Sequence, residues 1–158
     1  MADEADFPDQ KTVRIGGLTV HLIHGHQVVP WGDPAALLAL SRSLDADLLL
    51  HGHTHTTQIW HDKTTERMLL NPGSTTGAYS PFNTSVEHQP LACDTPIAAH
   101  RLKLRLTDAV LVLCCVLCSN VVPSFLVLSV RGKSCTVYCY EARGGEVRVT
   151  KADYSSPR

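Results

Sequence analysis

The chain opens with an alternating pattern that is typical of a β-hairpin. Between residues 12 and 23, apolar and polar side chains alternate on both sides of Gly16-Gly17. Alternation with a period of two puts the apolar side chains on one face of a strand, and a glycine pair is a common two-residue turn. The pattern therefore predicts a hairpin whose second strand ends at His24.

The hydrophobic period then changes to that of a helix. Asp33 precedes Pro34, a pair that is typical of a helix N-cap followed by the first helical residue. Leucines at helical spacing follow, so we expect a helix over residues 34–44. Residues 47–50 end in three leucines, which is typical of a strand buried on both faces of an α/β sheet. Strand, helix and strand form a βαβ unit, which predicts an α/β fold.

Further strands are expected in both halves of the chain. Two short apolar runs precede the turn-rich sequence Asn71-Pro-Gly-Ser74, and three longer runs follow residue 120, with glycines between them. The predicted strands are residues 58–61, 68–70, 121–130, 134–141 and 146–151.

One apolar run has an alternative interpretation. Residues 109–130 carry no charge and are numerous enough to span a bilayer as a helix. Asn120 and Pro123 interrupt the run, however, and a strand pattern follows it where a membrane span would be flanked by basic residues. We therefore expect no membrane span.

Charge and composition narrow the function. The 158 residues include 14 basic and 15 acidic side chains, so no excess positive charge is left for a nucleic-acid backbone or an anionic membrane. Acidic residues crowd the first nine positions, the reverse of the basic start of a signal peptide, and a cytoplasmic location is expected. In that compartment the six cysteines are expected to be thiols.

Histidines gather in one part of the sequence. Seven of the nine lie between residues 21 and 61, and His24-Gly-His26 and His53-Thr-His55 each follow a predicted strand. The carboxyl ends of parallel strands meet at one edge of a sheet, and imidazole is a common ligand of zinc, iron and manganese. One His-x-His group alone is commonly a hydrogen-bonded loop. Two such groups, each beside a glycine, predict a ligand site at this edge.

These motifs resemble those of a known family. Gly52-His-Thr-His55, followed by Asn71-Pro-Gly-Ser74, is similar to the last metal-binding motif and the next turn of calcineurin-like metallophosphoesterases. The longer strings Leu22–Asp33 and Asn71–Tyr79 resemble one branch of this superfamily, the small subunits of the retromer complex. The resemblance resumes after residue 120, so it covers most of the chain.

The resemblance implies a two-sheet α/β sandwich with helices outside, which here lacks the first βαβ units. It places the family's metal-site histidines on His24, His53 and His55, with zinc or manganese as the ion, weakly bound or absent. The family's first motifs supply a bridging carboxylate and further ligands, and these motifs have no counterpart in this sequence. We expect one incomplete domain over residues 1–158.

Residues 86–119 interrupt the family pattern and contain four of the six cysteines. Their removal would join Ser85 to Asn120 and restore a short family-like loop. We therefore expect this segment to be an insert outside the family fold, of the kind that a translated intron leaves.

The resemblance implies a scaffold in place of an enzyme. In a working metallophosphoesterase two metal ions hold the attacking hydroxide, and the ions need anionic ligands that three imidazoles do not supply. The expected function is a non-catalytic retromer subunit for endosome-to-Golgi and recycling transport, cytoplasmic and peripheral on the endosome membrane. Two alternatives stay open, a metal-dependent phosphoesterase and a truncated fragment without function.

Two docking surfaces follow from the same resemblance. The loop beside the metal site is expected to meet the large helical-solenoid subunit of retromer, and it consists of Val28, Val29, Pro30 and Trp31. An apolar patch on the opposite side is expected to receive endosomal regulatory proteins, and it consists of Val127, Tyr138 and Tyr140. Two tyrosines at this spacing also commonly do no more than cover a sheet, so this second surface rests on the resemblance.

Overall fold

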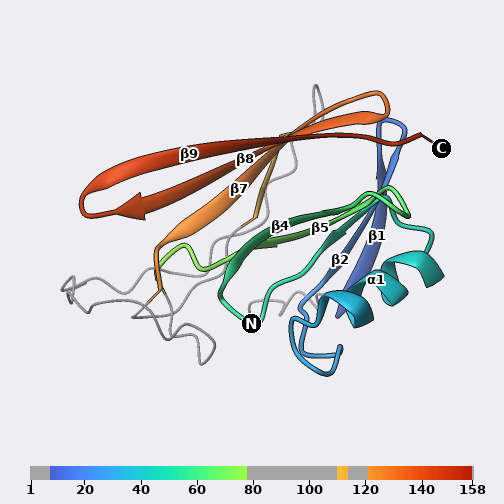
Figure 1. Ribbon diagram of the computed structural model, residues 1–158, viewed down its shortest axis with the longest axis horizontal. Coiled ribbons are helices and arrows are strands. Elements are labelled where there is room, and N and C mark those ends of the chain that lie inside the picture. The colour runs from blue at the N-terminus through green and yellow to red at the C-terminus, as the bar shows by residue number, and fades with distance from the viewer. Residues whose placement is uncertain (1–7, 78–109, 114–120, 158) are drawn as a thin grey trace, which may run out of the picture.

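The computed structural model describes residues 8–77, 110–113 and 121–157, and these residues form two β-sheets and one helix (Figure 1). The first sheet has the order β1-β2-β3-β5-β4 and the second has the order β6-β7-β8-β9. The elements are β1 (Gln10–Ile15), β2 (Leu18–Ile23), α1 (Pro34–Ser43), β3 (Leu48–Leu50), β4 (Thr57–Asp62), β5 (Arg67–Pro72), β6 (Val110–Leu113), β7 (Ser124–Arg131), β8 (Ser134–Arg143) and β9 (Glu146–Ser155).

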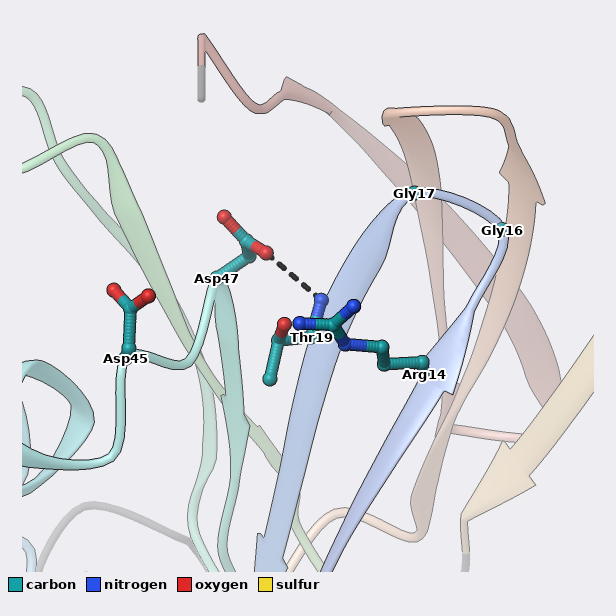
Figure 2. Close-up of a pocket in the computed structure, with 6 residues that line it drawn as sticks. All are labelled: Arg14, Gly16, Gly17, Thr19, Asp45 and Asp47. Carbon is teal, nitrogen blue, oxygen red and sulfur yellow. Dashed lines mark hydrogen bonds between the residues drawn. The ribbon is translucent and has the colours of Figure 1, made fainter.

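The predicted N-terminal hairpin is confirmed. Strands β1 and β2 pair in antiparallel register from Gln10 opposite Ile23 to Ile15 opposite Leu18. Gly17 N donates to Gly132 O at 2.7 Å, so this turn touches the turn between β7 and β8 in the second sheet. The turn also borders a pocket whose other wall carries Asp45 and Asp47 (Figure 2).

Helix α1 begins and ends within one residue of the predicted range 34–44. Asp33 is the N-cap, and its Oδ2 accepts a hydrogen bond from Ala36 N at 2.8 Å. Pro34 follows at the first helical position, where its missing N–H costs nothing. The N-cap carboxylate therefore satisfies one of the backbone donors that the start of any helix leaves free.

We expect the substitution Asp33→Ala to lower the free energy of unfolding by about 1 kcal/mol, because the Ala36 amide loses its acceptor at the end of the helix. Chemical denaturation measures this change. Asp33→Asn is the matched control, since its amide oxygen still accepts the hydrogen bond and most of the stability should remain. Equal losses in the two variants would contradict a capping role.

Three parallel strands form the centre of the first sheet. Strand β2 pairs with β3, and β3 pairs with β5, both in parallel register. All residues of β3 and β5 are buried, as the continuous apolar run at residues 47–50 predicted. Antiparallel strands β1 and β4 lie at the edges of the sheet. The predicted βαβ unit is thus confirmed as β2, α1 and β3.

Apolar side chains fill the space on both faces of the first sheet. Between the two sheets lie alternate residues of each strand, such as Val20, Leu50 and Leu70 against Leu126 and Val137. On the other face, α1 packs onto the sheet, and its buried Leu37 joins a second cluster of Ile23, Leu49 and Leu69. The order of layers is therefore helix, first sheet and second sheet (Figure 1).

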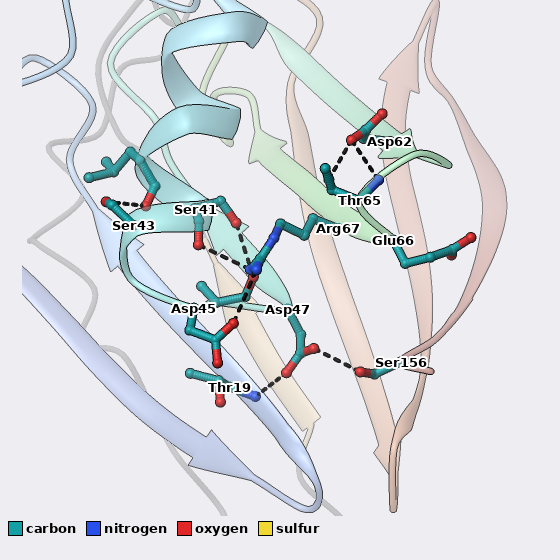
Figure 3. A network of polar contacts seen from close by, with 12 residues as sticks. Thr19, Ser41, Ser43, Asp45, Asp47, Asp62, Thr65, Glu66, Arg67 and Ser156 are labelled. Atoms are coloured by element: carbon teal, nitrogen blue, oxygen red, sulfur yellow. Dashed lines mark hydrogen bonds and ion pairs between the residues drawn. The ribbon is translucent and has the colours of Figure 1, made fainter. Parts of the chain in front are cut away.

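Arg67 joins the end of α1 to the first sheet (Figure 3). Its buried guanidinium donates to Ser41 O at 3.1 Å and to Ala46 O, and it pairs with Asp45 at 3.1 Å. Carbonyls at the end of a helix lack partners within the helix, and a cation is favourable there. This contact fixes the segment between α1 and β3, and with it the direction in which β3 enters the sheet.

The second sheet confirms the three strands predicted after residue 120. Strands β8 and β9 cover their predicted ranges, and β9 continues four residues beyond its predicted end, to Ser155. Strand β7 (Ser124–Arg131) begins three residues after the start of the predicted range 121–130. Strand β6 (Val110–Leu113) pairs with β7, and both lie in the apolar run 109–130. The described parts of that run are therefore strands and not a spanning helix. Nowhere in the described residues is a helix both long and apolar enough for a bilayer span.

The expected insert, residues 86–119, lies outside the described residues apart from β6. Its place outside the family fold stays a prediction, and so does the assignment of residues 1–158 to one incomplete domain.

Candidate functional site

Two loops meet at the carboxyl edge of the first sheet. His24 follows β2, and Gly52 follows β3, which is the parallel neighbour of β2. Gly52 N donates to His24 O at 2.9 Å. A Cβ at Gly25 would lie 2.8 Å from Gly52 O, and the φ of Gly25 is +111°, so only glycine allows this approach. The glycines beside the two histidine groups therefore bring the groups together.

The rings of His24, His26 and His53 form one cluster. The ring centroid of His24 lies 5.1 Å from the centroid of His26 and 5.1 Å from that of His53. The centroids of His26 and His53 are 6.2 Å apart. The Nδ1 atoms of His24 and His26 are 3.0 Å apart, so one ring donates a hydrogen bond to the other. The structure thus confirms that both groups meet at this edge. It also places the His26 ring directly beside His24, as a neighbour of the predicted metal-site histidines.

The surroundings of His24 and His53 favour their neutral forms. Partial desolvation is the largest cause that lowers the pKa of His24, and the charges of neighbouring histidines, His53 first, add to it. The pKa of His53 is also lowered. Desolvation is again the largest cause, and the charges of His26 and His55 add to it. A neutral imidazole keeps one unprotonated nitrogen, which can accept a hydrogen bond or bind a metal ion.

Asn71 holds the second histidine loop in place. This buried side chain donates to Thr54 Oγ1 at 2.9 Å and accepts from Gly73 N at 3.0 Å. On either side of Thr54, His53 and His55 have φ angles of +71° and +55°, a conformation that non-glycine residues rarely adopt. From the sequence, Asn71 belongs to a turn that follows the predicted strand 68–70, whereas the structure places it inside β5. Its position at the end of a buried apolar run is the signal that points to a role in the site.

The predicted docking loop has one half-buried and several exposed side chains. Val28 packs against the apolar cluster beneath α1, whereas Val29 is 75% exposed and Pro30 is also exposed. Trp31 is 48% exposed, and its ring stands edge-on to His53 with a centroid distance of 4.5 Å. The Trp31 indole donates to His26 O at 3.3 Å. The docking loop is therefore attached to the core and to the histidine cluster while it presents apolar side chains outward.

The histidine cluster does not fit the two-metal centre of a working phosphoesterase. Within residues 8–77, 110–113 and 121–157, no three His, Cys, Asp or Glu side chains are arranged to hold a metal ion. The side chains that gather at this edge are imidazoles, and two adjacent cations require anionic oxygen ligands. The assignment of His24, His53 and His55 as ligands stays a prediction.

The second predicted surface lies on the outer face of the second sheet. Val127 is directly opposite Tyr138, and Tyr140 is directly opposite Phe125. The rings of Phe125 and Tyr140 stack with a centroid distance of 4.7 Å and an angle of 2°. All four side chains are half-buried, which means that they cover the sheet and still reach solvent.

Strand β9 extends this apolar surface. Val149 lies opposite Tyr140, so the two side chains share a face, and Val147 follows on the same face two residues earlier. Val147 is 67% exposed and Val149 is 49% exposed. The family resemblance did not place Phe125, Val147 or Val149 on this surface. The alternating pattern of the strands could have placed them there once their register was known.

Comparison with known proteins identifies the family. Residues 2–88 match the family model described as the calcineurin-like phosphoesterase superfamily domain, and this match spans more than half of the chain. The chain belongs to the calcineurin-like phosphoesterase superfamily. The expected fold class, a two-sheet α/β arrangement of this superfamily, is thereby confirmed.

Within the superfamily the chain is similar to Vps29 proteins. Vacuolar protein sorting-associated protein 29 of Schizosaccharomyces pombe is 31% identical over 145 residues, which cover 92% of this chain and 60% of that protein. A single-mutant Vps29 from Entamoeba histolytica is 30% identical with a TM-score of 0.69, covering 96% of this chain and 63% of its own. A wild-type Vps29 from the same organism, complexed with Zn²⁺, is 32% identical with a TM-score of 0.65, covering 92% of this chain and 60% of its own.

These relatives confirm the resemblance to one branch of the superfamily that the histidine and turn motifs indicated. The chain spans between 60% and 63% of the length of the three relatives.

Proposed function

We propose that the chain is a non-catalytic scaffold subunit of retromer that acts in endosomal protein transport, including endosome-to-Golgi and recycling routes. The resemblance to Vps29, the small subunit of that complex, supports this proposal. It implies a cytoplasmic protein that is peripheral on the endosome membrane through its complex.

The observation that carries the proposal is the docking loop of Val28, Val29, Pro30 and Trp31. Side chains that are apolar, exposed and held by a rigid support are typical of the centre of a protein interface. Val29 and Trp31 meet this description, because Val28 and the His26 carbonyl hold the loop on which they stand. We assign the docking loop to the large helical-solenoid subunit of retromer.

We assign the outer face of the second sheet to endosomal regulatory proteins. Val127, Tyr138 and Tyr140 lie there together with the Phe125 ring and the exposed Val147 and Val149. Tyrosine offers a large apolar ring with a polar end, which favours it at interfaces that are also exposed to water.

We expect Val29→Asp to weaken capture of the large solenoid subunit by at least tenfold, which corresponds to about 1.4 kcal/mol. The reason is that a carboxylate without a partner loses its hydration when the interface closes. Val29 is 75% exposed, so the substitution should leave the fold intact. A pull-down with the purified solenoid subunit, at a series of concentrations, measures the loss.

Val147→Asp is the matched control for this measurement. Val147 is a valine of similar exposure, 67%, on the second surface. The Val147→Asp variant should capture the solenoid subunit as well as the unchanged chain does. If Val29→Asp keeps its circular dichroism spectrum and binds undiminished, the docking loop is not the interface.

We propose at most weak binding of one divalent ion, zinc or manganese, by His24, His53 and His55. The neutral state of His24 and His53 at pH 7 supports this, and so does the Zn²⁺ complex of the related Vps29 from Entamoeba histolytica. The all-imidazole donor set argues against a second ion.

A phosphodiesterase assay tests the non-catalytic part of the proposal. With bis-p-nitrophenyl phosphate and added manganese, we expect no turnover above that of manganese alone, because no anionic ligand joins the histidine cluster in the described residues. Turnover at enzyme-like rates that His53→Ala abolishes would favour the alternative, a metal-dependent phosphoesterase.

A further inference from the structure

The end of β9 is fastened to the first sheet by two side chains, Tyr154 and Ser156. Figure 3 shows the second of these contacts, between Ser156 and Asp47. Tyr154 Oη donates to Glu66 O at 2.8 Å. Ser156 Oγ donates to Asp47 Oδ1 at 2.8 Å, and both of these side chains are buried. We call this pair of contacts the β9 latch. The Ser156–Asp47 contact connects residues that are 109 positions apart in the sequence.

The Asp47 carboxylate is fixed in its position. Its other oxygen, Oδ2, accepts from Thr19 N at 2.8 Å, and its backbone accepts from Met68 N at 3.0 Å. The carboxylate therefore has little freedom to move away from Ser156. It also lines the pocket beside the hairpin turn at Gly16-Gly17 (Figure 2).

Ser156 lies in a short sequence that protein kinases recognise. Pro157 follows it directly, and a serine followed by proline is the minimal substrate of proline-directed kinases. The serine lies one residue beyond the last residue of β9, and the proline has no N–H with which to continue the strand. Backbone at the end of a strand opens locally at a low cost in free energy, and such opening exposes the Ser156 hydroxyl.

We propose that Ser156 is a phosphorylation site and that its phosphate opens the β9 latch. In the reaction Ser156 Oγ attacks the γ-phosphorus of ATP, an Oγ–P bond forms, the anhydride bond between the β- and γ-phosphates breaks, and ADP leaves. The hydroxyl proton passes to the base of the kinase. The product carries a charge of about −2. The latch cannot close again, because this charge and the Asp47 carboxylate would repel each other in one buried site.

The first experiment locates the phosphate. The full chain is incubated with ATP and a cyclin-dependent kinase, and the modified residue is assigned by peptide fragmentation, since Ser80 and Thr95 also precede prolines. We expect phosphate on Ser156, and no phosphate there in Pro157→Ala, which keeps the serine and its hydrogen bonds. Ser155→Ala is the matched control and should be modified at Ser156 as before. The proposal would be overturned if the kinase modifies a peptide of residues 150–158 but leaves Ser156 of the folded chain unmodified.

The second experiment tests the opening. Ser156 N donates to Lys133 O at 2.9 Å, so its amide should be protected from hydrogen exchange. We expect exchange at this amide to become about tenfold faster or more after phosphorylation, while amides of the central strand β3 are unchanged. In Asp47→Asn the acceleration by phosphate should be much smaller, because one of the two repelling charges is gone. Equal exchange with and without phosphate would overturn the opening of the latch.

Discussion

Gly73→Ala should be among the most damaging single substitutions in the chain, with an expected loss of about 3 kcal/mol in the free energy of unfolding. Gly73 follows β5 at the point where the two sheets meet. There Thr57 Oγ1 and Ser124 Oγ are 2.6 Å apart and hydrogen bonded. A Cβ on Gly73 would overlap both oxygens and would lie 3.1 Å from Thr57 N. To relieve the overlap both hydroxyls would have to rotate, which breaks the Thr57–Ser124 hydrogen bond and the bond from Ser124 Oγ to Pro72 O.

The turn between β7 and β8 provides a matched control for Gly73. Gly132 has a similar φ, +58° against +73°, but a Cβ there meets nothing within 4 Å. Gly132→Ala should therefore lower the free energy of unfolding by about 1 kcal/mol, the cost of a left-handed backbone conformation for a residue with a Cβ. Urea denaturation of both variants separates the conformational cost from the steric cost. Equal losses would show that the contact between the sheets adapts to an extra methyl group.

Acid should destabilise the fold through His51, by about 3 kcal/mol between pH 6.5 and pH 4. Burial is the main cause that lowers the pKa of His51 from 6.5 to about 4. Its Nε2 is buried without a hydrogen-bond partner, so an added proton would have no acceptor. Because the folded state binds the proton less tightly than the unfolded chain, the stabilising contribution is complete above pH 6.5. It is lost as the pH falls toward 4.

Denaturation with urea at a series of pH values, in the presence of EDTA, measures this loss. The His51→Gln variant should be less stable than the unchanged chain at pH 6.5. Between pH 6.5 and pH 4, however, its free energy of unfolding should fall by less, and the difference should be most of the loss of about 3 kcal/mol expected from His51. Leu37→Ala is the control, because it removes a buried apolar side chain and should lower stability equally at every pH. A pH profile of His51→Gln parallel to that of the unchanged chain would contradict the assignment.

The elements of the fold were predictable where local chemistry decides them. The glycine pair at 16–17, the cap formed by Asp33 with Pro34, and the alternating runs after residue 120 each act over a few residues. All of these elements occur where the sequence predicted them. Their limits were less certain, since β9 gains its last residues from pairing with β8 and from the β9 latch.

The site was predictable in part, for the same reason. Two histidine groups after two strands pointed to one edge of a sheet, because parallel neighbours end together. The sequence did not reveal that Trp31 stands against His53 or that Asn71 holds the loop at Thr54. These contacts depend on how closely two backbones approach, here at Gly25 and Gly52.

The sequence by itself determined the α/β class, the positions of the helix and of every described strand except β6, the histidine edge and the family. Each of these follows from hydrophobic period, capping and turn chemistry, or a motif of neighbouring residues. Only the tertiary structure decided that Val28 packs against the core while Val29 is exposed. It also decided that Phe125 and Val149 share one face with the tyrosines, and that Ser156 reaches Asp47. Such pairings join residues distant in the chain. They are fixed by strand register and by the packing of two sheets, which no local pattern specifies.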